Sequence, residues 1–383
     1  MRTIRGLLYT ENMSFEPGEI AFSGDTIEKI TFCGEDRLTA QEAAHYILPG
    51  LVDIHFHGCA GYDFCDGTME AMRAIASYEL THGITTICPA TMTLTEEMLT
   101  DICAACAEAV RTEVLQEEIP FGDVLRGIYL EGPFISMGKK GAQNPAYIRN
   151  PDRMMLTRLQ QAAEDLIKVV AIAPETKGAM DCIMNGKNDF CFSIAHTCAD
   201  YETAKSAIQA GAHHVTHLYN AMPPFTHREP GVVGAAAEDE QTDVELICDG
   251  IHIHPAVVKS TFKLFGAERV ILISDSKMAT GMEDGEYSLG GQSVQVRGNR
   301  ATLADGTIAG SAMNLFDCMR TAIRMGVPKE DAVRAATYNP ARAIGVEKEC
   351  GILQAGKKAD ILVTRKDFEL QEVIKSGKTI SVA

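Results

Sequence analysis

Two histidines one residue apart, His55 and His57, are the first residues of this sequence that could do chemistry. They stand at the end of the run Leu-Val-Asp-Ile-His-Phe-His-Gly, residues 51–58, which reads as a buried strand. Strand side chains alternate between two faces, so residues i and i+2 point to the same side. Both imidazoles can therefore reach one transition-metal ion beside the strand end. The pair also arises by chance in strands, so alone it only suggests a metal site.

Eight short apolar runs, of which residues 51–58 are the first, alternate with segments of helical character such as Met69–His82 and Glu96–Leu115. The runs are almost continuously apolar, which is typical of parallel strands covered on both faces. This alternation predicts an α/β fold, a (β/α)8 TIM-like barrel, with a doubly wound open sheet as the competing prediction. The other seven runs are Thr85–Met92, Arg126–Phe134, Val169–Glu175, Phe192–Cys198, His214–Met222, Glu245–Ile253 and Val270–Ser276.

Ionisable residues stand at the C-terminal ends of many of these runs. Barrel enzymes assemble their active sites at this face, from the ends of several strands. A histidine buried for packing explains any one of these positions, but not five histidines and two carboxylates on one rim. The pattern therefore predicts a metal-dependent hydrolase. The seven residues are His55, His57, Glu131, His196, His217, His252 and Asp275.

Longer strings of the chain carry a family resemblance. Residues 49–58 match the pattern Pro-Gly, two apolar residues, Asp-x-His-x-His-Gly. Residues 216–222 read Thr-His-Leu-Tyr-Asn-Ala-Met, and residues 227–231 read His-Arg-Glu-Pro-Gly. The first string resembles the amidohydrolase superfamily, and the other two resemble its N-acetylglucosamine-6-phosphate deacetylases. The resemblance extends over residues 46–363 and implies hydrolysis of N-acetyl-D-glucosamine 6-phosphate to D-glucosamine 6-phosphate and acetate, in amino-sugar catabolism.

The resemblance also implies a divalent metal centre with one or two ions per subunit. Glu131, His196 and His217 would hold the principal ion. His55 and His57 would hold a second ion, bridged to the first by Glu131. A set of histidines and carboxylates suits zinc, iron, manganese or cobalt.

Asp275 is the residue predicted to carry the proton transfers. A metal lowers the pKa of bound water from about 15.7 towards 7, and a carboxylate beside it can take the proton as the water attacks the acetyl carbonyl. The same acid can return the proton to the departing amine, which is otherwise a poor leaving group. His252 is predicted to contact the substrate carbonyl or a sugar hydroxyl.

The substrate phosphate needs a site of its own. The formal net charge is −17, from 52 acidic and 35 basic residues, so the overall field repels a sugar phosphate. Arg228 is the best candidate for a local cation. Asn220 and Ala221 follow His217 closely and can offer a side-chain amide and backbone N–H groups to oxygen atoms.

Further substrate contacts come from the resemblance alone. Ala142 and the segment Ile308, Ala309 and Gly310 resemble the family's sugar- and acetyl-facing residues. The roles of two residues stay open. Gln143 stands where many relatives have a histidine, and Glu175 ends the fourth apolar run.

The two ends of the chain fit a second, smaller unit. Short strand-like runs occupy the first 45 residues and resume after residue 352, separated by turn residues. Residues 1–48 and 352–383 are predicted to form a small β-sandwich domain, and residues 49–351 the barrel. Within the latter, residues 287–303 alternate like a β-hairpin.

Composition favours an enzyme of the cytoplasm that acts on a small molecule. No apolar run approaches the roughly 20 residues that span a bilayer. Twelve cysteines without compact spacing suggest reduced thiols, and the acidic balance argues against nucleic-acid binding. The resemblance implies a homodimer or a homotetramer. Two alternatives remain open: another substrate, such as the galactosamine epimer or a cyclic amide, and a non-catalytic relative.

Overall fold

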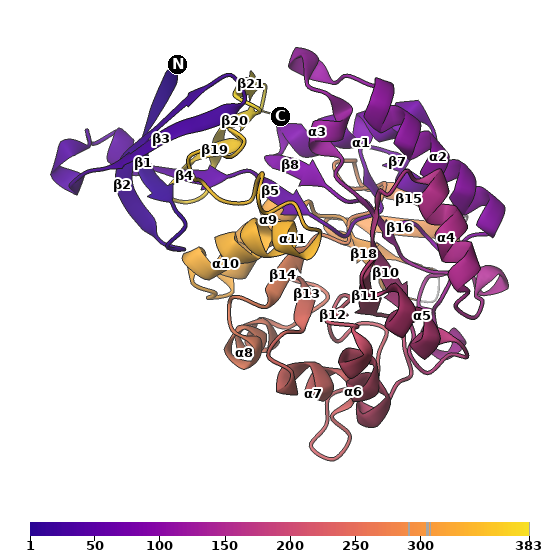
Figure 1. Ribbon diagram of the computed structural model, residues 1–383. Helices are drawn as coiled ribbons and strands as arrows, with labels where there is room; N and C mark the ends of the chain where they lie inside the picture. Colours follow the sequence, from indigo (N-terminus) through magenta and orange to yellow (C-terminus); the bar gives the residue numbers. More distant parts are fainter. Residues whose placement is uncertain (290–291, 304–305, 307, 383) are drawn as a thin grey trace.

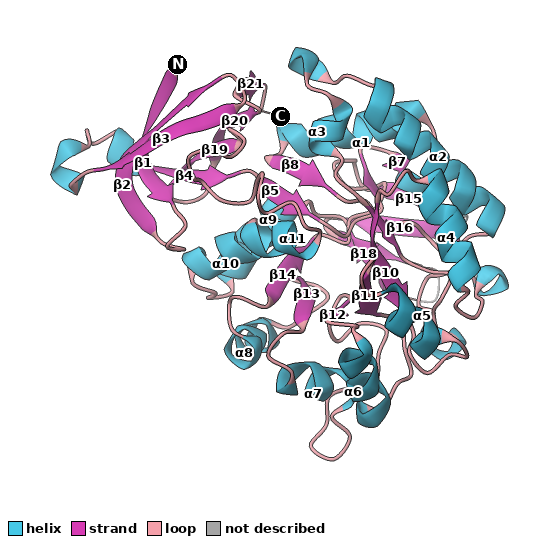
Figure 2. Cartoon of the chain, in the orientation of Figure 1, coloured by secondary structure: helices cyan, strands magenta, loops and turns pink. Residues whose placement is uncertain are grey.

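All eight apolar runs form strands in the computed structural model, which describes residues 1–289, 292–303, 306 and 308–382. The first two strands, β5 (Leu51–Asp53) and β8 (Ile84–Ile87), pair in parallel. The other six form one parallel sheet, visible in Figure 2, in the order β14 (Val270–Ile273), β13 (Asp243–Ile247), β12 (His214–Val215), β11 (Cys191–Ile194), β10 (Ile167–Ile172) and β9 (Ile128–Leu130).

The order of these strands decides between the two predicted architectures. Each strand of the six-stranded sheet lies beside its neighbour in the sequence, so among the described strands the order never reverses. A doubly wound sheet requires a reversal, because its switch point lies there. The doubly wound alternative is therefore wrong for this sheet.

Backbone contacts join both edges of the six-stranded sheet to the β5–β8 pair. At one edge, Ala90 and Tyr129 form a parallel bridge just beyond β8 and within β9. At the other edge, the amide of Asp275 donates to the carbonyl of His55 over 3.0 Å, and the amide of His57 donates to the carbonyl of Ser276 over 2.8 Å. The strand ends that carry the candidate residues are thereby held side by side.

Helices cover the outer side of these strands, as Figure 2 shows. In α2 (Glu96–Thr112), the Thr95 hydroxyl accepts from the amide of Met98 and caps the first turn. Cys103 and Cys106 lie on the buried face of this helix, where they pack rather than form a metal site. The other helices are α1 (Met69–Thr81), α3 (Phe121–Val124), α4 (Arg153–Ala162), α5 (Ala179–Gly186), α6 (Tyr201–Ala210), α7 (Gly231–Glu238), α8 (Pro255–Phe265), α9 (Leu315–Arg324), α10 (Lys329–Ala336) and α11 (Tyr338–Ala343).

The two chain ends share one seven-stranded sheet, at the upper left of Figure 1. The C-terminal strand β19 (Ile361–Arg365) pairs antiparallel with β4 (His45–Pro49), the last strand before the first apolar run. The sheet order is β21 (Lys378–Ile380), β20 (Leu370–Lys375), β19, β4, β1 (Arg2–Tyr9), β2 (Phe15–Ser23) and β3 (Thr26–Phe32). Its own apolar cluster draws on both ends of the chain, including Leu8, Ile47 and Ile361.

Two smaller sheets lie near the candidate residues. Strands β6 (Gly58–Cys59) and β7 (Tyr62–Asp63) form a short hairpin directly after His57. The antiparallel sheet β15 (Gly285–Leu289), β16 (Gln292–Arg297), β17 (Arg300–Thr302) and β18 (Ile308–Ser311) follows β14. The predicted hairpin falls within it, except that residues 290–291 lie outside the described residues. Ser311, at the end of β18, bridges Ser276, which brings this sheet to the strand ends.

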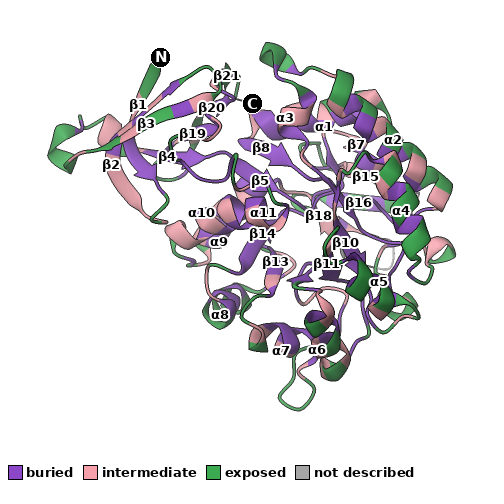
Figure 3. Cartoon of the chain, in the orientation of Figure 1, coloured by how far each residue is buried: buried purple, intermediate pink, exposed green. Residues whose placement is uncertain are grey.

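Burial follows the layers, with the central strands buried and the outer helix surfaces exposed (Figure 3). None of the described helices is both long enough and apolar enough to cross a bilayer. One ionisable group is also buried in this shell. Glu79 of α1 is fully buried, and neither of its carboxyl oxygens has a hydrogen-bond partner among the described residues. Burial, with the Asp53 carboxyl nearby, raises the pKa of Glu79 well above its usual range.

We expect the unfolding free energy of Glu79→Gln to increase relative to that of the parent protein as the pH rises from 4 to 8. The folded parent keeps a proton on Glu79 that the unfolded chain releases above its pKa of about 4.3, so the parent loses stability with rising pH. The difference in unfolding free energy should grow by up to about 1.4 kcal/mol per pH unit. Urea unfolding of both proteins across this range measures it. A difference that stays constant with pH would show that Glu79 does not carry the proton.

Candidate metal centre and substrate cavity

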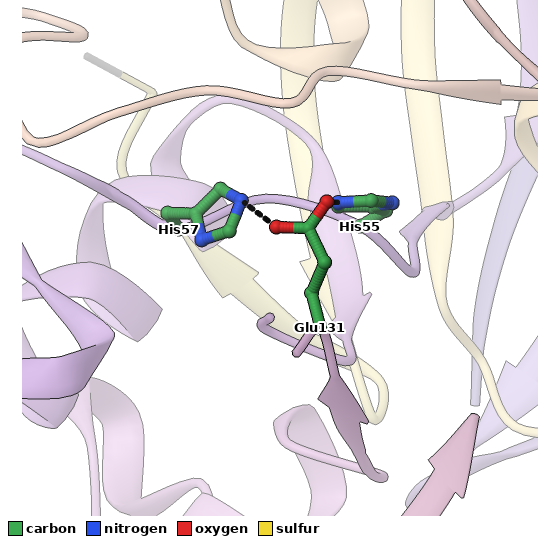
Figure 4. A group of neighbouring side chains, drawn as sticks. All are labelled: His55, His57 and Glu131. Carbon is green, nitrogen blue, oxygen red and sulfur yellow. Dashed lines mark ion pairs between the residues drawn. The ribbon is translucent and has the colours of Figure 1, made fainter. Parts of the chain in front are cut away.

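Glu131 belongs to two groups of side chains that could each hold a metal ion. One group is His55, His57 and Glu131, and the other is Glu131, His196 and His217. In each group the possible ligand atoms lie within 4.8 Å of one another, and all five residues are buried. Figure 4 shows the Glu131 carboxylate between two imidazoles, with one oxygen turned towards His55 and the other towards His57.

The two oxygens of Glu131 face different histidines. Oε1 lies 3.4 Å from His55 Nε2, 3.1 Å from His196 Nε2 and 3.2 Å from His217 Nε2. Oε2 lies 3.3 Å from His57 Nε2. A carboxylate that presents its oxygens to two sets of nitrogen donors has the arrangement of a bridging ligand.

The backbone conformation helps to aim these side chains. His196, His217 and Asp275 each lie two residues beyond the end of a strand and have positive φ angles of 41°, 27° and 47°. L-residues rarely adopt this region, and such strained conformations cluster at functional sites. At the ends of β11, β12 and β14 the positive φ ends the extended backbone as the chain turns into the loops around the cavity.

The donor set fits a divalent ion. Nε2 of His55 and both ring nitrogens of His57 are buried, and in the part of the chain that the structure describes they have no hydrogen-bond partner. Buried polar atoms are normally satisfied, so these nitrogens call for a further partner. Imidazole nitrogens and a carboxylate are the ligands that zinc, iron, manganese and cobalt accept.

The pKa values of His55 and His217 are shifted in opposite directions. Burial alone would lower the pKa of His55, but the Glu245 and Glu131 carboxylates raise it to about 10. Burial lowers the pKa of His217. A metal ligand must be a neutral imidazole, so His217 is ready to bind, whereas His55 must first give up a proton.

Glu245 is a residue of the site that the sequence reading missed. Its Oε2 lies 2.8 Å from His55 Nδ1 and accepts the backbone N–H of His217 over 3.1 Å, and its Oε1 lies 2.9 Å from His214 Nε2. Burial would raise the pKa of Glu245, but His55 and His214 lower it to about 2. A carboxylate on one ring nitrogen orients the other towards a metal. His214 is thus coupled to the site through Glu245.

Asp275 lies beside His57. Its Oδ1 lies 3.4 Å from His57 Nε2 and accepts a hydrogen bond from Lys277 Nζ over 2.8 Å. Burial would raise the pKa of Asp275, but the Lys277 ammonium and the His57 imidazole hold it well below its usual range. The carboxylate is therefore ionised and able to accept a proton.

Lys277 was also missed by the sequence reading, although its spacing of two from Asp275 was a usable signal. It is buried and reaches Asp275 past Gly310. A Cβ at Gly310, whose φ is +78°, would lie 1.9 Å from Lys277 Cε. The missing side chain at this position leaves room for the lysine.

A cavity of about 340 Å³ opens onto these groups, within the size range of small-molecule sites. Most of the predicted catalytic, metal and substrate residues line it, together with Lys139, Gln143 and Lys277, whereas His55 and His57 are not among its lining residues. The predicted residues that line it are Glu131, Ala142, His196, His217, Asn220, Ala221, His252, Asp275 and Gly310.

His252 lines this cavity, and a hydrogen bond at one of its ring nitrogens leaves the second nitrogen for the substrate. Its Nδ1 lies 2.7 Å from Asp249 Oδ2, and Asp249 Oδ1 accepts the backbone N–H groups of Ile251 and His252, each over 2.9 Å. A carboxylate can only accept here, so Nδ1 carries the proton. Nε2 is then the atom left for a substrate oxygen.

Some predicted residues lie elsewhere. Arg228 is exposed, in the loop between β12 and α7, and is not among the residues that line this cavity. The side chains of Ile308 and Ala309 lie outside the described part of the chain. Glu175 is exposed and accepts hydrogen bonds of 2.5 Å from Thr197 Oγ1 and the Cys198 amide, so it holds the segment after His196.

Known proteins resemble this chain over nearly its full length. The model of the Amidohydrolase family matches residues 46–380. The N-acetylglucosamine-6-phosphate deacetylase of Bacillus subtilis (strain 168) is 36% identical over 369 residues, which cover 95% of this chain and 92% of that protein. The N-acetylgalactosamine-6-phosphate deacetylase of Escherichia coli O157:H7 is 34% identical, with 88% of each chain covered.

A solved structure is similar in the same way. It is a variant of the N-acetyl-D-glucosamine-6-phosphate deacetylase of Mycobacterium smegmatis in complex with N-acetyl-D-glucosamine-6-phosphate. Its TM-score is 0.90 at 33% identity, with 98% of each chain covered. The chain is thus similar to deacetylases of two epimeric sugar phosphates.

Proposed function

The chain belongs to the amidohydrolase family, and we propose that it hydrolyses N-acetyl-D-glucosamine 6-phosphate to D-glucosamine 6-phosphate and acetate. The observation that carries this function is one cavity whose lining includes Glu131, His196, His217 and the ionised Asp275, with His55 and His57 grouped around the same Glu131. Relatives that bear the name of this activity match the chain over almost all of its length.

We propose that Glu131, His196 and His217 hold a divalent ion, and that His55 and His57 hold a second ion with Glu131 as the bridge. Zinc, iron, manganese and cobalt all suit these ligands. An ion bound there would lower the pKa of water towards 7 and polarise the acetyl carbonyl.

Asp275 carries the proton in this proposal. As the water oxygen forms a bond to the acetyl carbon, Asp275 accepts the proton that the water loses. When the bond between carbon and nitrogen breaks, Asp275 returns that proton to the amine. Lys277 holds the carboxylate in position over 2.8 Å. His252 donates or accepts at a substrate oxygen through Nε2, because Asp249 fixes the proton on Nδ1.

The substrate phosphate is assigned to Asn220, Ala221 and Arg228. Asn220 and Ala221 support this, since both line the cavity. Arg228 is exposed, in the loop between β12 and α7. We therefore propose a homodimer, or a homotetramer built from such dimers, in which Arg228 reaches the phosphate in the partner's cavity.

We expect Arg228→Ala to raise KM for the phosphorylated sugar by about 10- to 100-fold, because a charge-assisted hydrogen bond contributes about 1.5–3 kcal/mol. Hydrolysis of unphosphorylated N-acetylglucosamine should not change. Steady-state kinetics on both substrates measures this, with Arg365→Ala, an exposed arginine of the seven-stranded sheet, as the matched control. Equal losses on both substrates would argue against a phosphate contact.

Acetate release from three substrates tests the function itself. They are N-acetylglucosamine 6-phosphate, its galactosamine epimer and the unphosphorylated sugar. The similarity to the Escherichia coli enzyme makes the galactosamine epimer the second candidate substrate. Faster release from the glucosamine form supports the proposal, and faster release from the epimer supports the alternative. No release from protein loaded with metal would reject both, and cyclic amides would then be screened.

We also propose the finer features of the fold and location. The eight strands would close into a (β/α)8 barrel over residues 49–351, supported by the backbone contacts at both sheet edges. Residues 1–48 and 352–383 would form the β-sandwich domain, supported by their shared apolar cluster. A cytoplasmic location is supported by the twelve cysteines, all of which are free.

A further inference from the structure

Gln143 ties the Glu131 carboxylate to the backbone of a neighbouring strand end. Its Nε2 lies 2.6 Å from Glu131 Oε2, and its Oε1 accepts the backbone N–H of Thr93 over 2.7 Å. The residue is only 3% exposed and lines the cavity beside Glu131. No role followed from the sequence for this position.

The orientation of the Gln143 amide follows from its partners. A backbone N–H can only donate, so the atom facing Thr93 must be the carbonyl oxygen. The atom facing Glu131 is then the NH₂ group, which can only donate to the ionised carboxylate. The amide nitrogen has no lone pair for a metal, and the amide oxygen is already engaged. Gln143 therefore acts on the metal centre through Glu131 and not as a ligand.

The hydrogen bond reaches one oxygen of the bridge and not the other. Oε2, which Gln143 holds, is the oxygen 3.3 Å from His57 Nε2. Oε1 faces His196 and His217, at 3.1 and 3.2 Å, and lies 3.4 Å from His55 Nε2, so Oε2 is the oxygen that serves His57. Without the hydrogen bond from Gln143, Glu131 could rotate and turn both oxygens towards His196 and His217. The position between His55 and His57 would then lose its carboxylate ligand.

The segment that carries Gln143 also touches the other histidine pair. The carbonyl of Lys139 lies 2.9 Å from His196 Nδ1, so it accepts a hydrogen bond from that nitrogen and directs Nε2 towards Glu131. One loop thereby orients ligands of both candidate positions. Of these two loop residues, it is Gln143 whose side chain contacts Oε2, the oxygen on the His57 side.

We propose that Gln143 is a positioning residue that sets the affinity of the metal position between His55 and His57, by fixing Glu131 in its bridging orientation. This inference rests on the proposed metal function. Loss of a partner that orients a metal ligand costs about 10- to 100-fold in metal affinity. The loss should fall on the His55–His57 position and spare the position at His196 and His217.

Zinc titration of the metal-free full-length protein tests this inference, by calorimetry together with a count of bound zinc after dialysis. We expect the parent protein to bind two ions per chain. Gln143→Leu should bind the tighter ion as the parent does and the weaker ion about 10- to 100-fold less tightly. Asparagine is too short to reach both partners, so Gln143→Asn should also lower the affinity for the weaker ion. This polar variant keeps the inference testable if the leucine variant misfolds.

The matched control is Gln160→Leu. Gln160, in α4, also bridges two backbone groups: its side chain accepts from the amide of Ile167 over 3.0 Å and donates to the carbonyl of Ile167 over 3.2 Å. It does not belong to either donor group. It should bind zinc as the parent does. Equal weakening of both ions in the Gln143 variants, or no change, would overturn the inference. A parent protein that binds a single ion would overturn the two-ion proposal itself, and this result is visible before any variant is made.

Discussion

Asp275→Asn is expected to lower kcat for deacetylation by about 10²- to 10⁴-fold, the usual contribution of a general acid–base group. Asparagine has nearly the same shape, but it can neither accept the proton from water nor deliver it to the amine. Steady-state kinetics at neutral pH measures the loss. Bound metal and thermal unfolding should stay close to those of the parent, because the two candidate metal groups do not include Asp275.

Asp367→Asn serves as the control for this change, since Asp367 is exposed on the turn between β19 and β20. It should leave kcat unaltered. If Asp275→Asn kept a near-normal rate, the proton transfers would have to pass through another residue. Lys277 and His252 would then be the groups to replace next, because they line the same cavity.

Glu131→Gln should remove metal from both positions at once, and activity with it. Glu131 is the single residue common to both groups that could hold an ion among the described residues. Burial would raise the pKa of Glu131, yet the surrounding histidines hold it well below its usual range, so it supplies the negative charge of the centre. We expect metal affinity to fall by more than the roughly 10- to 100-fold that loss of an outer partner costs.

Bound-metal analysis after dialysis measures this loss, and Glu79→Gln is the matched control. Glu79 is likewise fully buried, but it does not belong to either donor group. It should retain the parent's metal content. Retention of two ions by Glu131→Gln would mean that the ions do not share a carboxylate bridge.

Much of the fold was predictable because its signals are local. Each of the eight apolar runs became a strand, and the helical segments at residues 69–82 and 96–115 became α1 and α2 within a few residues at each end. Periodicity and burial on both faces decide such elements. The pairing of the chain ends was predictable from the similar style of their strands, and β19 does pair with β4.

The donor set was predictable in part, for the same physical reason. His55, His57, Glu131, His196 and His217 all stand at strand ends, so a parallel sheet brings them to one edge, as the two donor groups confirm. The roles of these residues remain proposals. The choice between barrel and doubly wound sheet needed the strand order, which no single run of sequence contains.

Residues that act through another residue were harder to predict. Glu245 lies inside an apolar strand, and nothing near it in the sequence shows that His55 and His214 will approach from two other strands. Gln143 is similar, because its partners Thr93 and Glu131 come from separate strand ends. Such contacts depend on distances across the fold, which spacing along the chain does not report.

The pairing of β19 with β4 also has a consequence for how the protein is made. On the ribosome, strands β1 to β4 emerge well before their partner β19, because the whole of the intervening barrel segment is synthesised between them. Throughout that interval one edge of β4 is an open row of backbone donors and acceptors, a template for pairing with other chains. The nascent protein must therefore keep this edge apart from its neighbours until β19 has been synthesised, so termination before β19 would leave a product prone to aggregation.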